Sequence, residues 1–167
     1  GWHLSYFAGK ARCYLKYKGI PFVEGPLNLY TLMVRNKRKT GEVVMPVLRT
    51  PEEQWLQHTS VIIDRMEARF PQAPVIPATP RQRLVAYLLE AWGDEWWIPI
   101  AMHTRWSYAE NYALWEKDTG PALLPLFPKF LQRKAAAIPA KAMRGKLHNV
   151  GIRPEQADMM NAWTVNM

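Results

Sequence analysis

The chain has 167 residues, and its 22 Lys and Arg against 14 Asp and Glu give a formal net charge of +8. A hydrophobic share of 49% with 22% charged residues is an ordinary globular composition, and no apolar run approaches the roughly 18 residues of a membrane span. No signal-peptide pattern opens the sequence, and its single cysteine cannot form an internal disulfide, so we expect a soluble, cytoplasmic protein.

The positive charge raises the question of a nucleic-acid partner. Basic residues are spread along the chain, with loose clusters at 35–39 and 133–146, and no zinc-finger, helix-turn-helix or RNP pattern accompanies them. Nucleic-acid binding therefore ranks last, and a solvated basic face or attraction for an anionic ligand is favoured. The four histidines share no metal-ligand spacing and no glycine-rich phosphate loop is present, so we expect no metal.

The first forty residues predict a helix, a strand and a second helix. Apolar side chains recur at helical spacing over residues 7–18, and Gly19 ends this helix. Residues 20–24 predict a short strand, and residues 27–37 predict a weaker helix that Thr40 and Gly41 end.

Residues 43–49 predict two strands interrupted by Pro46. Proline has no N–H to donate to a strand ladder, so a proline inside a strand pattern indicates a specific backbone geometry. We expect this geometry to be a cis Met45-Pro46 bond. Such a bend leaves the N–H and C=O of Met45 free to pair with the main chain of a bound peptide. Residues 50–53 predict a turn, and residues 55–56 continue the sheet.

A third helix is predicted to end near Arg69, before four closely spaced prolines. Prolines at 71, 74, 77 and 80 preclude helix and suit an extended connector. Beyond it the pattern is helical to the end, with a kink or break around Gly93 and Pro99. The helices are expected at 81–92, 107–117, 121–137 and 154–165. The predicted organisation is an N-terminal domain at 1–73, a proline-rich linker at 74–80 and an all-helical domain at 81–167.

An ordered set of short motifs resembles bacterial-type glutathione S-transferases. The matching stretches, whose order and spacing agree with that family, are 5–12 (SYFAGKAR), 18–22 (KGIPF), 45–48 (MPVL) and 59–71. The resemblance covers about residues 2 to 106 and implies an α/β thioredoxin-like domain followed by an all-α domain. Only Trp2, His3 and Leu4 precede the first helix, and the chain ends abruptly, so we expect a fragment whose first strand is truncated.

The resemblance places a catalytic serine or cysteine at Ser5. A free thiol is mostly protonated at pH 7, and a hydroxyl donor beside the positive end of a helix favours the thiolate. Two alternatives stay open: Ser5 only caps the helix, or Tyr6 is the donor, since several classes of the family use a tyrosine there. Cys13 lies too late in the helix to be the family's nucleophile, no Cys-x-x-Cys pair exists, and we expect Cys13 to be buried.

The resemblance also implies the glutathione-binding residues. Met45 matches the residue whose main chain pairs with the cysteinyl part of glutathione, and Pro46 matches the cis-proline. Thr59 supplies a hydroxyl at a helix N-terminus, where a carboxylate is favoured, or serves only as a helix cap. His58 departs from the family, which has an acidic residue there, and pairs with an ammonium only through a neutral ring nitrogen.

Aromatic residues near residue 95 have two interpretations. In the resembling fold this helix lines the pocket for a hydrophobic substrate, which implies a pocket formed by Phe7, Trp92 and Trp96. Packing of the tryptophans in the core is the alternative.

Two functional hypotheses follow. The first is a glutathione transferase that uses the glutathione thiolate on a small hydrophobic electrophile and, by resemblance, forms a homodimer. The second is a non-catalytic module of the same fold that binds a ligand or docks other proteins, which the departure at His58 favours.

Overall fold

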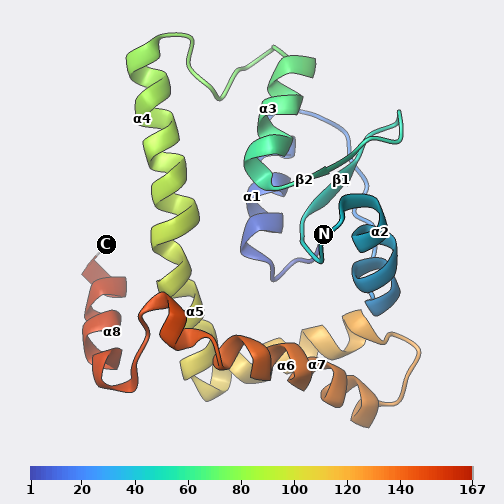
Figure 1. Ribbon diagram of the computed structural model, residues 1–167, viewed down its shortest axis with the longest axis vertical. Helices are drawn as coiled ribbons and strands as arrows, with labels where there is room; N and C mark the ends of the chain where they lie inside the picture. Colours follow the sequence, from blue (N-terminus) through green and yellow to red (C-terminus); the bar gives the residue numbers. More distant parts are fainter. Residues whose placement is uncertain (167) are drawn as a thin grey trace. The chain divides into compact units, whose positions relative to one another are not determined.

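The computed structural model describes residues 1–166 of the chain, which divides into two compact units, Gly1–Arg83 and Leu84–Met167. The first unit combines helices with a two-stranded sheet, and the described part of the second is helical (Figure 1). No helix among residues 1–166 is both long enough and apolar enough to cross a membrane.

Helix α1 (Tyr6–Tyr17) begins and ends where its capping residues predict. Ser5 is the N-cap, and its Oγ accepts a hydrogen bond from the Ala8 N–H at 3.3 Å. Gly19 has a φ of +65°, which lets the chain turn away after the helix. The prediction that Cys13 is buried was wrong: it lies on the exposed side of α1. The buried side consists of Ala8, Ala11, Tyr14 and Leu15.

The segment after α1 is irregular until residue 29. The predicted strand at 20–24 was wrong, because no segment of the described chain forms a ladder with it. Asn28 and Thr31 then exchange two hydrogen bonds, from Asn28 N–H to Thr31 Oγ1 at 2.9 Å and from Thr31 N–H to Asn28 Oδ1 at 2.8 Å. Helical structure follows as a π-helical segment, Thr31–Asn36, and α2, Lys37–Thr40. Gly41, with a φ of +84°, ends it as predicted.

The sheet is an antiparallel pair of short strands, β1 (Val47–Arg49) and β2 (Trp55–Gln57), with Leu48 opposite Leu56. The Met45-Pro46 bond is cis, as expected. The predicted strand before Pro46 is absent, because residues 43–45 lie outside the ladder and Pro46 has no N–H to continue it.

Helix α3 (Thr59–Arg69) closes the core of the first unit, and it ends where predicted. Tyr14 and Leu15 of α1 pack against Ile62 and Met66 of α3. The partly buried residues around this cluster are Ile20, Phe22, Leu48, Leu56, Ile63 and Phe70.

An ion pair at the surface joins the β-hairpin to the end of α3. Both terminal guanidinium nitrogens of Arg69 lie 2.6 Å from the carboxylate oxygens of Glu52. Hydrogen bonding from Arg69 lowers the pKa of Glu52 to about 2. The hairpin is therefore tied to α3 by a bidentate contact.

A kink or break was predicted around Gly93 and Pro99, and the helical structure is not broken there. Helix α4 (Pro80–Ala91) continues through a π-helical segment, Trp92–Trp96, into α5 (Trp97–Ser107). Pro99 lacks the N–H that an α-helix would direct to the residue 95 carbonyl, and a π-helical turn just before it relieves that conflict.

The second unit continues with α6 (Ala109–Leu123) and α7 (Lys129–Arg144), which pack together. A helix was predicted to begin at Pro121, but Pro121 lies inside α6 and the next helix follows Pro128. Two 3-10 turns, Leu147–Val150 and Pro154–Gln156, lead to α8 (Ala157–Asn166). Ile100, Ile152 and Met160 form the buried core between α5 and these C-terminal segments.

Gly120 marks a close approach between α6 and α7. A Cβ added there would lie 2.9 Å from the Gln132 carbonyl oxygen, a backbone atom. We expect Gly120→Ala to lower the free energy of unfolding by about 1 to 3 kcal/mol, because the helices must separate. Urea denaturation would measure this change.

Gly9→Ala is the matched control, since a Cβ at Gly9 meets no atom within 4 Å. There we expect a gain of up to about 1 kcal/mol from helix propensity alone. A Gly120→Ala protein as stable as the Gly9→Ala protein would contradict the close packing of α6 on α7.

Candidate functional site

The predicted catalytic residues lie together at the start of α1. The Ser5 hydroxyl oxygen accepts the Ala8 N–H, so Ser5 caps α1. The Ser5 oxygen accepts this bond through a lone pair. The hydroxyl hydrogen of Ser5 therefore remains available for a hydrogen bond to a ligand. Tyr6 is 43% exposed, and its ring contacts the Phe7 ring edge to face, with centroids 5.4 Å apart. Capping and thiol activation by Ser5 are therefore compatible.

A cavity of about 930 Å³ lies within the first unit. Its walls come from α1, the irregular segment after α1, the π-helical segment, the stretch from Met45 to Pro51, and α3. Met45 and Pro46 belong to this wall, as do core residues such as Leu15 and Ile62. The cavity volume is in the range of small-molecule sites. The residues recorded as lining it do not include Ser5, Tyr6, Phe7, His58 or Thr59.

The edge of β1 opposite β2 offers backbone groups to a ligand. The Thr50 N–H donates to the Gln54 carbonyl at 2.9 Å, on the β2 side. Because backbone groups alternate along a strand, those of Val47 and Arg49 point to the opposite edge. Within residues 1–166, no hydrogen bond to another backbone group is recorded for Met45. An extended peptide can therefore pair with this edge.

Thr59 and His58 mark the start of α3. Thr59 is 5% exposed, and His58 is the N-cap residue with a φ of +65° and no capping hydrogen bond from its side chain. The first-turn N–H groups of a helix have no acceptor inside that helix, so this end suits a carboxylate. The exposed His58 ring lies with Nε2 4.0 Å from Glu42 Oε2. The fold thus places the Glu42 carboxylate beside His58, the position where the resembling family has an acidic residue.

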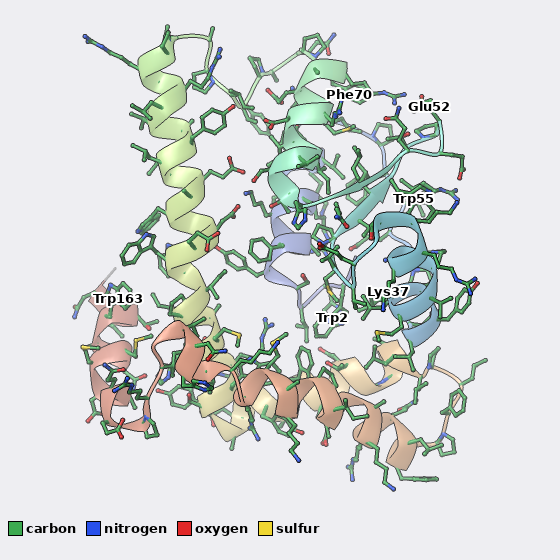
Figure 2. The ribbon with its side chains drawn as sticks, viewed as in Figure 1. Trp2, Lys37, Glu52, Trp55, Phe70 and Trp163 are labelled. Atoms are coloured by element: carbon green, nitrogen blue, oxygen red, sulfur yellow. The ribbon has the colours of Figure 1, made fainter. Side chains whose placement is uncertain are left out.

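Positive charge gathers around Trp55 at the cavity wall. Arg35, Lys39 and Arg49 lie 5.8, 6.0 and 6.0 Å from the centre of the Trp55 ring. Trp55 lies on β2, and β2 contacts α2. Figure 2 labels Trp55 and Lys37, the first residue of α2. The Trp55 indole nitrogen is buried and has no hydrogen-bond partner among the described residues. This wall therefore favours an anionic ligand.

Sequence reasoning missed the role of this basic wall. The cluster at 35–39 is visible in the sequence, but its relation to Trp55 and Arg49 depends on how α2 packs on the hairpin. The local signals were this basic cluster and a tryptophan inside a short predicted strand.

The tryptophans predicted for a substrate pocket belong to the second unit. Trp92 is 43% exposed and Trp96 is 60% exposed, so neither is a core residue. Trp92 packs edge to face on Trp97, with centroids 5.4 Å apart. Their part in a pocket with Phe7 stays a prediction.

Residues 1–74 match the family model described as "Glutathione S-transferase, N-terminal domain". This match supports a glutathione S-transferase-family N-terminal domain with a thioredoxin-like fold over residues 1–74, and the described part of the unit after it is helical. The predicted fold class and family resemblance are thus confirmed. No curated protein and no solved structure gave a significant match to the chain.

Proposed function

We propose that this protein binds glutathione through its N-terminal domain and uses the glutathione thiolate to attack a small hydrophobic electrophile. The observation that carries the proposal is the match of residues 1–74 to the glutathione S-transferase N-terminal domain. Three features support it, because glutathione is an anionic peptide. They are the start of α3, where the His58 side chain makes no capping bond, the Met45 backbone, which bonds to no other backbone group within residues 1–166, and the basic wall around Trp55.

The γ-glutamyl carboxylate would bind at the start of α3, on Thr59 and the first-turn N–H groups. The cysteinyl main chain would pair with Met45 next to Pro46. The family's acidic residue at the ammonium is His58 here, and Glu42 beside it supplies the negative charge instead. His58 then positions Glu42.

The reaction would be a substitution at the electrophile. The Ser5 hydroxyl donates a hydrogen bond to the glutathione sulfur, which stabilises the thiolate at the positive end of α1. The thiolate forms a carbon–sulfur bond and the leaving group departs with the electron pair. Tyr6 is the alternative donor of this hydrogen bond.

The organisation of the protein forms part of the proposal. We propose an active transferase with domains at 1–73 and 81–167 and a linker at 74–80. We propose that it is cytoplasmic and forms a homodimer. A non-catalytic ligand-binding module is the second candidate, and the replacement of an acidic residue by His58 favours it.

Thr59→Val tests glutathione binding. The substitution keeps the shape of a buried side chain and removes its hydroxyl, so glutathione affinity should fall by about 1 to 3 kcal/mol, as measured by calorimetry. Thr119→Val is the matched control in the second unit, where the buried Thr119 hydroxyl has no partner among the described residues. It should leave affinity unchanged. Wild-type protein that releases no heat at millimolar glutathione would end the proposal.

Glu42→Gln tests the substitute for the acidic residue. The Glu42 side chain is 60% exposed, so we expect a modest loss of glutathione affinity, about 0.2 to 1 kcal/mol. The loss should disappear with a glutathione analogue that lacks the amino group. Glu53→Gln, at an exposed turn, serves as control, and equal effects of the two substitutions would argue against a specific role for Glu42.

A further inference from the structure

A nucleophile, a base and an amide lie in one hydrogen-bonded chain in the second unit, on α5 and α8. His103 of α5 is 2% exposed. Its Nδ1 lies 3.1 Å from the Ser107 hydroxyl oxygen, and its Nε2 lies 3.0 Å from Asn161 Oδ1 on α8. Helices α5 and α8 contact each other (Figure 1).

The hydrogen bonds fix which ring nitrogen of His103 is the base. Asn161 Oδ1 can only accept, and it also accepts the Tyr108 hydroxyl. His103 must therefore donate its proton from Nε2 to Asn161. In the neutral ring Nδ1 then carries the lone pair, so Ser107 donates its O–H to a nitrogen able to remove that proton.

Ser107 differs from an ordinary helical hydroxyl. Thr104, one turn of α5 earlier, bonds to its own helix at the Ile100 carbonyl, 2.9 Å away, as serine and threonine usually do inside helices. Ser107 instead directs its hydroxyl to His103 and is itself exposed. The nucleophile is thus accessible while its base is shielded and held by two further side chains.

The chain continues directly from Ser107 into a helix start. Tyr108 is the N-cap of α6 and makes no capping bond with its side chain, since its hydroxyl bonds to Asn161. The first-turn N–H groups of α6 have no acceptor inside the helix, and they are suited to stabilise a negative oxygen.

We propose that Ser107, His103 and Asn161 form a second active site, which transfers acyl groups from carboxylic esters or thioesters to water. Ser107 Oγ attacks the carbonyl carbon while its proton passes to His103 Nδ1. The tetrahedral intermediate expels the alcohol or thiol, which takes that proton. Water then attacks the acyl-serine with His103 as base, releasing the acid and restoring Ser107. Asn161 and Tyr108 are positioning residues that hold the His103 ring.

A fluorophosphonate probe tests this site, because phosphorus–oxygen bond formation at serine releases fluoride and needs the same proton acceptor. The chain has three serines, Ser5, Ser60 and Ser107, so the unactivated ones are internal controls. Peptide mass spectrometry should show Ser107 labelled about 100-fold faster than the other two. Absence of label at Ser107, or equal labelling of all three serines, would overturn the proposal.

Variants of His103 and Asn161 distinguish activation of Ser107 by its hydrogen bonds from reactivity that is due to exposure alone. His103→Gln should abolish labelling of Ser107, but removing this buried ring risks unfolding, which circular dichroism would reveal. Asn161→Ala and Asn161→Asp therefore form a second pair that leaves His103 in place. We expect labelling to fall about tenfold or more in Asn161→Ala and to return in Asn161→Asp, whose carboxylate also accepts from Nε2. Equal labelling of both variants and the wild-type protein would refute a role for this chain of hydrogen bonds.

Discussion

Replacing Lys18 with methionine is expected to destabilise the first unit by about 1 to 3 kcal/mol, because it leaves the partly buried Glu67 carboxylate without its cationic partner. The Lys18 side chain is 0% exposed, and its Nζ lies 2.8 Å from Glu67 Oε1. Lys18 also donates to the Gln72 carbonyl at 2.6 Å. The substitution therefore also removes a hydrogen bond that holds the connector after α3. Urea denaturation followed by far-UV circular dichroism would measure the change.

The environment of Glu67 predicts how this loss depends on pH. Burial raises the pKa of Glu67, but hydrogen bonds from Lys18, Tyr14 and the N–H groups of Val75 and Ile76 outweigh it, and the pKa is lowered. A lowered carboxyl pKa contributes stability above the unfolded value, and this stability is lost as pH falls through the folded value. In Lys18→Met the carboxyl is easier to protonate. The difference in unfolding free energy between Lys18→Met and the wild-type protein should therefore shrink as pH falls from 7 toward 4.

Two controls accompany this experiment. Lys16→Met makes the same change on the exposed side of α1 and should alter stability by less than about 0.5 kcal/mol. The double variant Lys18→Met with Glu67→Gln should recover part of the loss, because no unpaired charge remains. A Lys18→Met deficit that is the same at pH 4 and pH 7 would show that the ion pair is not its cause.

Ser5→Gly is expected to slow conjugation of glutathione to an aromatic electrophile by about 100-fold, the cost of losing one preorganised donor at developing charge. The pKa of the bound thiol should rise, and glutathione affinity should change little. Glycine is chosen over alanine because it is a tolerated N-cap, which costs only a few tenths of a kcal/mol, whereas alanine costs about 1 kcal/mol. Thiolate absorbance of bound glutathione against pH, together with the conjugation rate, measures the effect.

Tyr6→Phe is the control for the choice of donor. If Ser5 is the donor, Tyr6→Phe leaves the titration curve of the bound thiol in place. A curve shifted only in Tyr6→Phe assigns the role to Tyr6. Two unshifted curves in a protein that binds glutathione favour the non-catalytic module.

Features set by neighbouring residues were predictable. The start and end of α1 follow from Ser5 and Gly19, and the end of the helical segment before β1 follows from Gly41. The cis geometry at Met45-Pro46 follows from a proline interrupting a strand pattern. The order of these features carried the family resemblance, which the match over residues 1–74 confirms. Local backbone chemistry and motif order are properties of the sequence itself.

Features that depend on distant partners were not predictable. Residues 20–24 have a strand composition, yet a strand needs a neighbour to receive its hydrogen bonds, and the described chain provides none. Cys13 suits a core by type, but the side of α1 that packs on α3 excludes it. The partner of His58 is Glu42, and that of His103 is Asn161, 58 positions further along the chain. Such pairs form only when packing fixes which helix faces meet, because spacing along the chain carries no information about contacts between separate elements.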